Sequence, residues 1–214
     1  MRTLAELFPL ATSETLIAQG SYTYRCNGEL TDISEPWLRH RQADGSVVTR
    51  SSRSDGESFV LGAKYWCKAG VVFASLYWEN VSGVRTASYA LGAGGLRWSA
   101  DGSPPVSQAC SPTTVFFPLM RIFSGDTLLA IMEQGGEATV LVPSIKTPEH
   151  AESLFAPLFS ERCVEQVTTD VYHYRGGEYD DAACYQLGAD GLLQRYEWQQ
   201  SPAQLWVVEL VQSS

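Results

Sequence analysis

The sequence lacks the cysteine and histidine pairs that mark metal sites and disulfide frameworks. Its five cysteines are widely spaced and odd in number, with no C-x-x-C pattern, at Cys26, Cys67, Cys110, Cys163 and Cys184. The three histidines, His40, His150 and His173, are equally dispersed. This spacing favours neither a zinc site nor a set of disulfides, so we expect free thiols and no bound metal.

Long apolar runs and a surplus of basic residues are also missing. The first ten residues are broken by Glu6 and Pro9 and do not form the apolar core of a signal peptide, and no stretch is long enough for a membrane span. The formal net charge of −9 disfavours binding to phosphate backbones. We therefore expect a cytoplasmic protein that binds no nucleic acid and is not integral to a membrane.

Motifs for nucleotide binding and nucleophilic catalysis are absent as well. The glycine-rich segment Gly92-Ala93-Gly94-Gly95 lacks the Lys-Ser/Thr of a phosphate loop and indicates a β-turn. No G-x-S-x-G nucleophile elbow occurs. The sequence thus predicts no cofactor and assigns no catalytic residue.

What the chain does contain is a series of β-strand patterns. Tyr22, Tyr24 and Cys26 alternate with polar residues, as in a half-buried strand. Two further strand patterns, 37–41 and 46–52, flank Ala43-Asp44-Gly45, which predicts a hairpin because Asp-Gly readily adopts the positive φ angles of a tight turn. The tripeptide Ala-Asp-Gly recurs at 100–102 and 189–191, and predicts turns there too.

The middle of the chain has a different character. Pro112 precedes Thr113–Phe123 and Ser124-Gly125 follows it, which predicts a short helix interrupted by Pro118. Residues 127–133 and 137–142 flank Gln134-Gly135-Gly136 and predict a hairpin. A second helix is predicted over 147–155, with Thr147 as its N-cap.

These patterns predict one domain over residues 1–214. It comprises a β meander at 20–99, a helix-containing middle at 103–160 and a second meander at 162–212. The fold class is mostly β (α+β), with about ten to twelve antiparallel strands and two short covering helices. A sheet of that size must curl, so we expect a curved sheet or an open half-barrel with a concave face.

Aromatic residues recur on alternate positions of several predicted strands. Tyrosine and tryptophan combine an apolar body with a polar tip, which suits a partly wet cavity better than a dry core. The predicted ligand-binding residues are Tyr22, Tyr24, Trp37, Tyr172, Tyr174, Tyr196 and Trp198.

Polar residues gather at one place, in the segment 172–181. His173, Glu178 and Asp180 stand around a Gly-Gly turn and could form an acid–base site if a cleft shifted one of their pKa values. A solvated hairpin explains the same residues without any chemistry.

The overall pattern resembles the lipoprotein-carrier superfamily of LolA, LolB and LppX type, including its glycolipid-binding branch. The similarity lies in a β meander, a middle with short helices around Phe116–Met120 and Pro148–Phe155, and a terminal meander ending in Leu193–Trp198. It implies a curved half-barrel whose hollow is covered by helices and takes up acyl chains.

The function predicted from these features is non-catalytic binding of a lipid, a glycolipid or another apolar or amphipathic small molecule in a concave, aromatic-lined cavity. Two alternatives remain open: an enzyme acting on a hydrophobic substrate in the same cavity, and a protein–protein interaction module. The sequence specifies neither the ligand nor the oligomeric state.

Overall fold

The computed structural model describes residues 2–145 and 154–211, which form one open sheet of 15 strands. The strands follow the order β8-β7-β6-β5-β4-β3-β2-β1-β15-β14-β13-β12-β11-β10-β9. All neighbours are antiparallel except β9 and β10, which pair in parallel. The expectation of a mostly β, largely antiparallel fold is therefore confirmed, whereas the count of about ten to twelve strands is too low.

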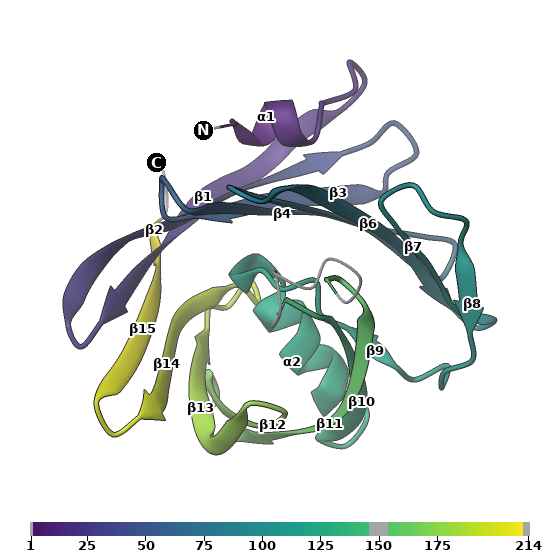
Figure 1. The fold of residues 1–214 in the computed structure, drawn as a ribbon. Helices are drawn as coiled ribbons and strands as arrows, with labels where there is room; N and C mark the ends of the chain where they lie inside the picture. The colour runs from purple at the N-terminus through teal and green to yellow at the C-terminus, as the bar shows by residue number, and fades with distance from the viewer. Residues whose placement is uncertain (1, 146–153, 212–214) are drawn as a thin grey trace.

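The first eight strands form a curved layer, here called the arch (Figure 1). Its strands are β1 (Thr15–Cys26), β2 (Glu29–Arg41), β3 (Val47–Ser54), β4 (Phe59–Lys68), β5 (Val71–Asn80), β6 (Gly83–Gly92), β7 (Gly95–Ala100) and β8 (Val106–Gln108). The Asp-Gly hairpin expected at 43–45 connects β2 to β3, as the sequence predicted.

The remaining strands continue the sheet and curl back beneath the arch, forming what we call the roll (Figure 1). They are β9 (Val115–Phe116), β10 (Glu137–Pro143), β11 (Pro157–Gln166), β12 (Val171–Gly176), β13 (Tyr179–Leu187), β14 (Leu193–Ser201) and β15 (Gln204–Val211). Strand β15 pairs with β1 and joins the roll to the arch.

A short helix lies inside the roll. This helix, α2 (Ser124–Met132), follows directly on the 3-10 turn η1 (Arg121–Phe123). The one-turn helix α1 (Leu4–Leu7) lies instead on the outer side of the arch, where Leu4 and Phe8 pack with Tyr77. None of the helices in the described part of the chain is long and apolar enough to cross a membrane.

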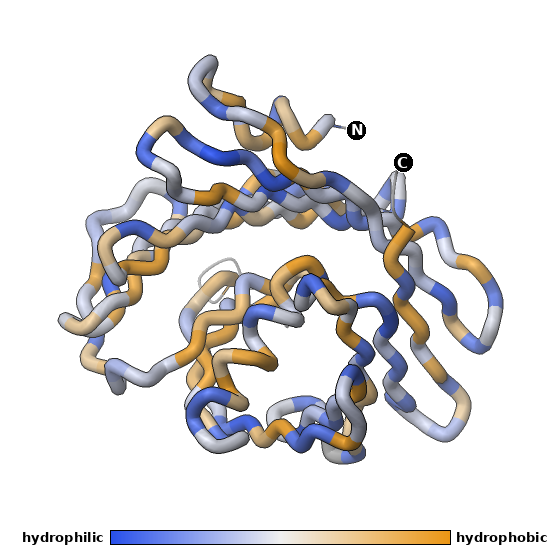
Figure 2. The backbone as a smooth tube through the Cα atoms, turned by 180° about the vertical axis from the view of Figure 1, so that it is seen from behind, coloured by the Kyte–Doolittle hydropathy of each residue, from blue (hydrophilic) through white to orange (hydrophobic). Residues whose placement is uncertain are grey.

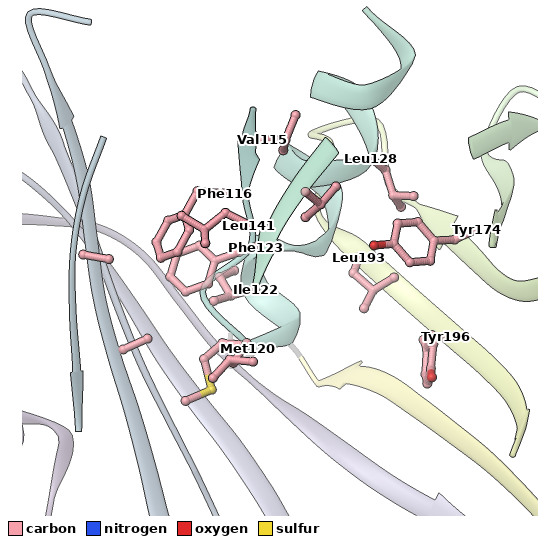
Figure 3. Close-up of a cluster of buried hydrophobic side chains, with 14 of the residues drawn as sticks. Val115, Phe116, Met120, Ile122, Phe123, Leu128, Leu141, Tyr174, Leu193 and Tyr196 are labelled. Carbon is pink, nitrogen blue, oxygen red and sulfur yellow. The ribbon is translucent and has the colours of Figure 1, made fainter. Parts of the chain in front are cut away.

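The main core lies between the arch and the roll. The segment 115–123 runs through it, and Phe116 and Phe123 point toward the strands of the arch, whereas Leu128 and Leu193 lie on the side of the roll (Figure 3). The hydropathy colouring is correspondingly apolar along α2 and the strands beside it (Figure 2). One continuous core thus holds the two layers together.

Two expectations about the middle of the chain are wrong. Residues 113–123 form no α-helix; they contain β9 and η1, because Pro118 lacks the N–H that a helix interior needs. Residues 127–133 do not form a hairpin strand but lie in or next to α2. This helix begins at Ser124, the position at which the sequence pattern predicted the end of a helix. Most of the helix expected at 147–155 falls outside the described residues, and Leu154 and Phe155 lie in a turn.

The outer side of the arch carries a buried ion pair. Arg50 Nη2 lies 2.8 Å from Glu14 Oε2, and both side chains are almost fully excluded from solvent. The pair links β3 to the segment between α1 and β1. The N-terminal segment is therefore attached to the outer face of the arch by this ion pair as well as by the apolar contacts of Leu4 and Phe8.

Candidate functional site

A cavity of about 400 Å³ lies within the roll, between α2 and the strands β10 to β13. Its apolar wall includes Phe117 and Leu119 before the helix, Leu128 on the helix, and Leu158 and Phe159 on β11. Its volume lies within the range of small-molecule pockets. Leu158 is also 44% exposed, which places it where the cavity meets the surface.

Three guanidinium groups line this mostly apolar cavity. Arg53 comes from β3, Arg121 from η1 and Arg162 from β11. One carboxylate, Glu178, lines the cavity among the described side chains. The cavity of a chain whose net charge is −9 is thus bordered by an excess of positive groups.

A buried glutamate fixes the position of Arg121. Glu35 on β2 is fully excluded from solvent, and its Oε1 accepts a hydrogen bond of 2.5 Å from the backbone N–H of Arg121. Its Oε2 accepts one of 2.6 Å from the hydroxyl of Tyr24 and lies 4.0 Å from Arg53 Nη1. The arch therefore holds the first residue of η1 through the main chain and leaves the Arg121 side chain to extend toward the roll.

Four tyrosines from β12, β13 and β14 surround the Arg121 guanidinium. These residues, here called the tyrosine cluster, are Tyr174, Tyr179, Tyr185 and Tyr196. Their rings pack edge to face, with centroids 4.9 Å apart for Tyr185–Tyr196 and 5.7 Å apart for Tyr174–Tyr185. Figure 3 shows Tyr174 and Tyr196, which lie on β12 and β14, the two strands on either side of β13 in the roll.

Two of these rings lie beneath guanidinium groups. Arg121 Cζ lies 3.9 Å from the centroid of Tyr196, and Arg162 Cζ lies 5.6 Å from that of Tyr174. Both are within the range of cation–π attraction, which stabilises a charge that has lost water. The cluster thus supplies neutral support for two cations.

Burial changes the acidity of the groups around the cavity. It raises the pKa of Glu35, although Arg53 and the hydroxyl of Tyr24 partly oppose that shift. It also raises the pKa of Tyr174, Tyr185 and Tyr196, so these phenols stay neutral.

Tyr179 behaves differently from the rest of the cluster. Burial opposes its ionisation, but the charge of the nearby Arg121 guanidinium and hydrogen bonds with Tyr196, Tyr185 and Arg121 together lower the pKa of Tyr179 below the ordinary tyrosine value.

The seven aromatic residues predicted to bind ligand are all at least partly buried, but they do not all reach the cavity. Tyr174 lines it directly. Tyr196 supports Arg121, and Trp198 packs edge to face on Tyr179, which itself lines the cavity. The other four, Tyr22, Tyr24, Trp37 and Tyr172, are buried elsewhere on the inner side of the sheet.

The polar residues considered for acid–base chemistry are not brought together in the described part of the structure. Glu178 lines the cavity, but His173 is absent from its wall and alternates with Tyr172 and Tyr174, which point inward. The side chain of Asp180 lies outside the described set. Among described residues there is also no group of three or more His, Cys, Asp or Glu side chains suited to a metal ion.

The five cysteines, all within the described ranges, are free thiols, as the sequence led us to expect. Cys163 and Cys67 are exposed, and the other three are partly buried. None of the five lines the cavity.

Sequence reasoning missed the arginines, which are the most distinctive feature of the site. Arg53, Arg121 and Arg162 are far apart in the chain and belong to no motif. One signal was present: Arg121 is the only charged residue in the apolar run 115–123, and a charge in such a run needs a polar environment in the folded protein.

No protein-family model, no curated protein and no solved structure matches this chain.

Proposed function

We propose that the protein binds an amphipathic small molecule, without chemical change, in the cavity of the roll. The observation that carries this proposal is the cavity of about 400 Å³ itself, apolar along much of its wall and bordered by guanidinium and phenol groups. A mostly apolar pocket with a few polar groups that orient the ligand is typical of small-molecule sites. The proposal keeps the class of ligand implied by the resemblance to lipoprotein carriers.

The enzyme alternative has less support. An acid–base site needs a titratable pair within reach of one reacting atom. Of the described candidates, Glu178 lines the cavity, whereas His173 does not. The remaining polar groups of the cavity wall are mainly cations, hydroxyls and phenols, which suit binding better than proton transfer.

Binding can be tested with Nile red, an uncharged dye whose emission rises in apolar surroundings. We expect the dye to bind saturably at one site, and 1-decanol to displace it. The driving force is burial of the apolar tail, which contributes roughly 0.8 kcal/mol for each methylene group.

A variant that fills the cavity provides the structural control. Ser160 lines the cavity on β11, so Ser160→Trp places a large side chain in it and is expected to abolish dye binding. Glu165 lies on the same strand but is exposed, and Glu165→Trp is expected to bind the dye as the wild type does. Absence of a saturable dye site in the wild type, or unchanged binding in folded Ser160→Trp, would remove the proposal.

A further inference from the structure

We infer that the ligand carries an acidic head, a carboxylate or a phosphate, which binds to Arg121 and Arg162 at the end of the cavity formed by the tyrosine cluster. This inference rests on the proposed function and specifies the class of ligand. The apolar wall then holds the tail of the same molecule.

Arg121 has hydrogen-bonding capacity that the described residues leave unused. Its Nε is buried and has no hydrogen-bond partner among the described residues. The groups around its guanidinium are phenols: the ring of Tyr196, the hydroxyl of Tyr185 at 3.5 Å from Nη1, and Tyr179. A buried cation is costly unless it is paired and hydrogen-bonded, so this group is suited to receive an anion.

Arg162 presents a similar group in the same cavity. Its Nε and Nη1 are buried and likewise find no hydrogen-bond partner in the described part of the chain. The guanidinium packs directly on the turn between β12 and β13, where a Cβ atom on Gly177 would lie only 1.6 Å from Nη1. Because glycine has no side chain, Gly177 allows the Arg162 guanidinium to occupy this space.

A third polar group, a hydroxyl, borders the same space. Ser124, the first residue of α2, lines the cavity, and its buried Oγ has no partner within the described ranges. The first turn of a helix carries partial positive charge, which favours an anion. A hydroxyl donor and two guanidinium groups together match the several acceptor oxygens of a carboxylate or phosphate.

The charge of the cavity contrasts with that of the whole chain. Three of its lining residues are arginines, although acidic residues outnumber basic ones by 24 to 15 in the sequence. The Arg121 guanidinium also contributes to the lowered pKa of Tyr179. Selectivity for an anion therefore arises inside the cavity and not from the surface.

The test compares ligands that share one tail and differ in the head. Decanoic acid, decyl phosphate, 1-decanol and decylamine are each titrated against protein loaded with Nile red at neutral pH. We expect at least one of the two acids to bind ten-fold or more tightly than 1-decanol, because charge-assisted hydrogen bonds are stronger than neutral ones. Decylamine is expected to bind less tightly than 1-decanol.

The order of the two acids identifies the head. Tighter binding of decyl phosphate points to a phosphate, tighter binding of decanoic acid points to a carboxylate, and equal binding assigns a site for either. If 1-decanol displaces the dye as well as both acids do, the acidic head is excluded while the proposed function stands. If no dye binds at all, the proposed function itself fails.

Variants of the two arginines locate the head. Arg121→Met and Arg162→Met keep much of the length of the side chain and remove its charge, so each is expected to weaken binding of the preferred acid at least ten-fold and to change binding of 1-decanol by much less. Arg175 is exposed on β12 and does not line the cavity, and Arg175→Met serves as the control. Equal losses for acid and alcohol in either folded variant would contradict the assignment, and the ligand comparison in the wild type decides the question if a variant does not fold.

Discussion

Glu35 connects the arch to η1, the turn that carries Arg121 of the candidate site. Its carboxylate accepts hydrogen bonds from Tyr24 and from the main chain of Arg121, with no exposure to solvent. The residue was not singled out in the sequence, because one acidic residue before a proline in a strand pattern has no distinguishing signature. Its importance arises from the register of β2 against a segment more than eighty residues away.

Burial of Glu35 predicts a specific dependence of stability on pH. Because the pKa of Glu35 is raised in the folded protein, the unfolded chain binds fewer protons between the ordinary and the raised values. The free energy of unfolding therefore falls as pH rises through that window. Glu35→Gln cannot ionise, so its stability relative to the wild type is expected to increase with pH, as measured by urea unfolding at a series of pH values.

The exposed carboxylate of Glu57 provides the control, since Glu57→Gln is expected to retain the wild-type profile. Glu35→Ala should cost about 3 kcal/mol or more at all pH values, because it leaves buried donors without an acceptor. A Glu35→Gln variant with the same pH profile as the wild type would show that Glu35 does not titrate in the expected way.

At the scale of elements, strands were predictable and the central helix was not. The strands were predictable because one side of the sheet is buried along most of its length, which requires apolar and polar residues to alternate along each strand. Residues 127–132 are mostly apolar, although Leu129 is exposed, and a short apolar run does not distinguish a helix from a buried strand. Gly125 suggested the end of a helix but lies in the first turn of one.

The reason for Gly125 is a close approach of two backbones. A Cβ atom at this position would lie 1.9 Å from the carbonyl oxygen of Gly191, in the turn between β13 and β14. We therefore expect Gly125→Ala to lower the free energy of unfolding by about 1–3 kcal/mol, as overpacking typically does. Thermal and urea unfolding would measure the loss.

Asp126 provides a matched control in the same turn of the helix. Its side chain is largely exposed and pairs with Arg39 at 3.3 Å, so Asp126→Ala is expected to cost less than about 1 kcal/mol. For Gly125→Ala, helix propensity alone predicts the opposite result, because alanine favours a helix over glycine and would raise the free energy of unfolding by about 1 kcal/mol. Such a gain would mean that α2 does not pack as closely on the roll as the structure has it.

At the scale of the whole molecule, the arch and the roll share one sheet and one core. The segment 101–114 connects them, is mostly exposed and carries only the short edge strand β8. We expect limited proteolysis to cut here first, because edge and loop backbone opens more readily than paired strands. The two fragments should remain associated during gel filtration, since β1 pairs with β15 and the core spans both.

Separation of the fragments as two independently folded proteins would contradict the expectation of one domain over residues 1–214. The nick itself should leave binding of Nile red intact, because none of the cavity-lining residues lies within 101–114. Loss of dye binding after cleavage within 101–114 would indicate that the dye binds outside the cavity of the roll.

The architecture explains which parts of the site were beyond prediction from sequence. The sequence indicated a curved sheet with aromatic residues on its inner side, and Tyr174 does line the cavity. It did not reveal that β15 pairs with β1, and this pairing is what joins the roll to the arch. Arg53 and Arg162 border one space only because of that long-range arrangement.

The most direct test of an acidic head beside Arg121 is the titration of a bound carboxyl group. Decanoic acid labelled with ¹³C at its carboxyl carbon can be followed by NMR in the presence of the protein. We expect a separate bound resonance whose carboxyl pKa lies below that of the free acid, because the guanidinium groups favour the carboxylate. A bound carboxyl group that titrates at or above the pH of the free acid, or a spectrum with only the free resonance when decyl phosphate does not bind either, would contradict the account.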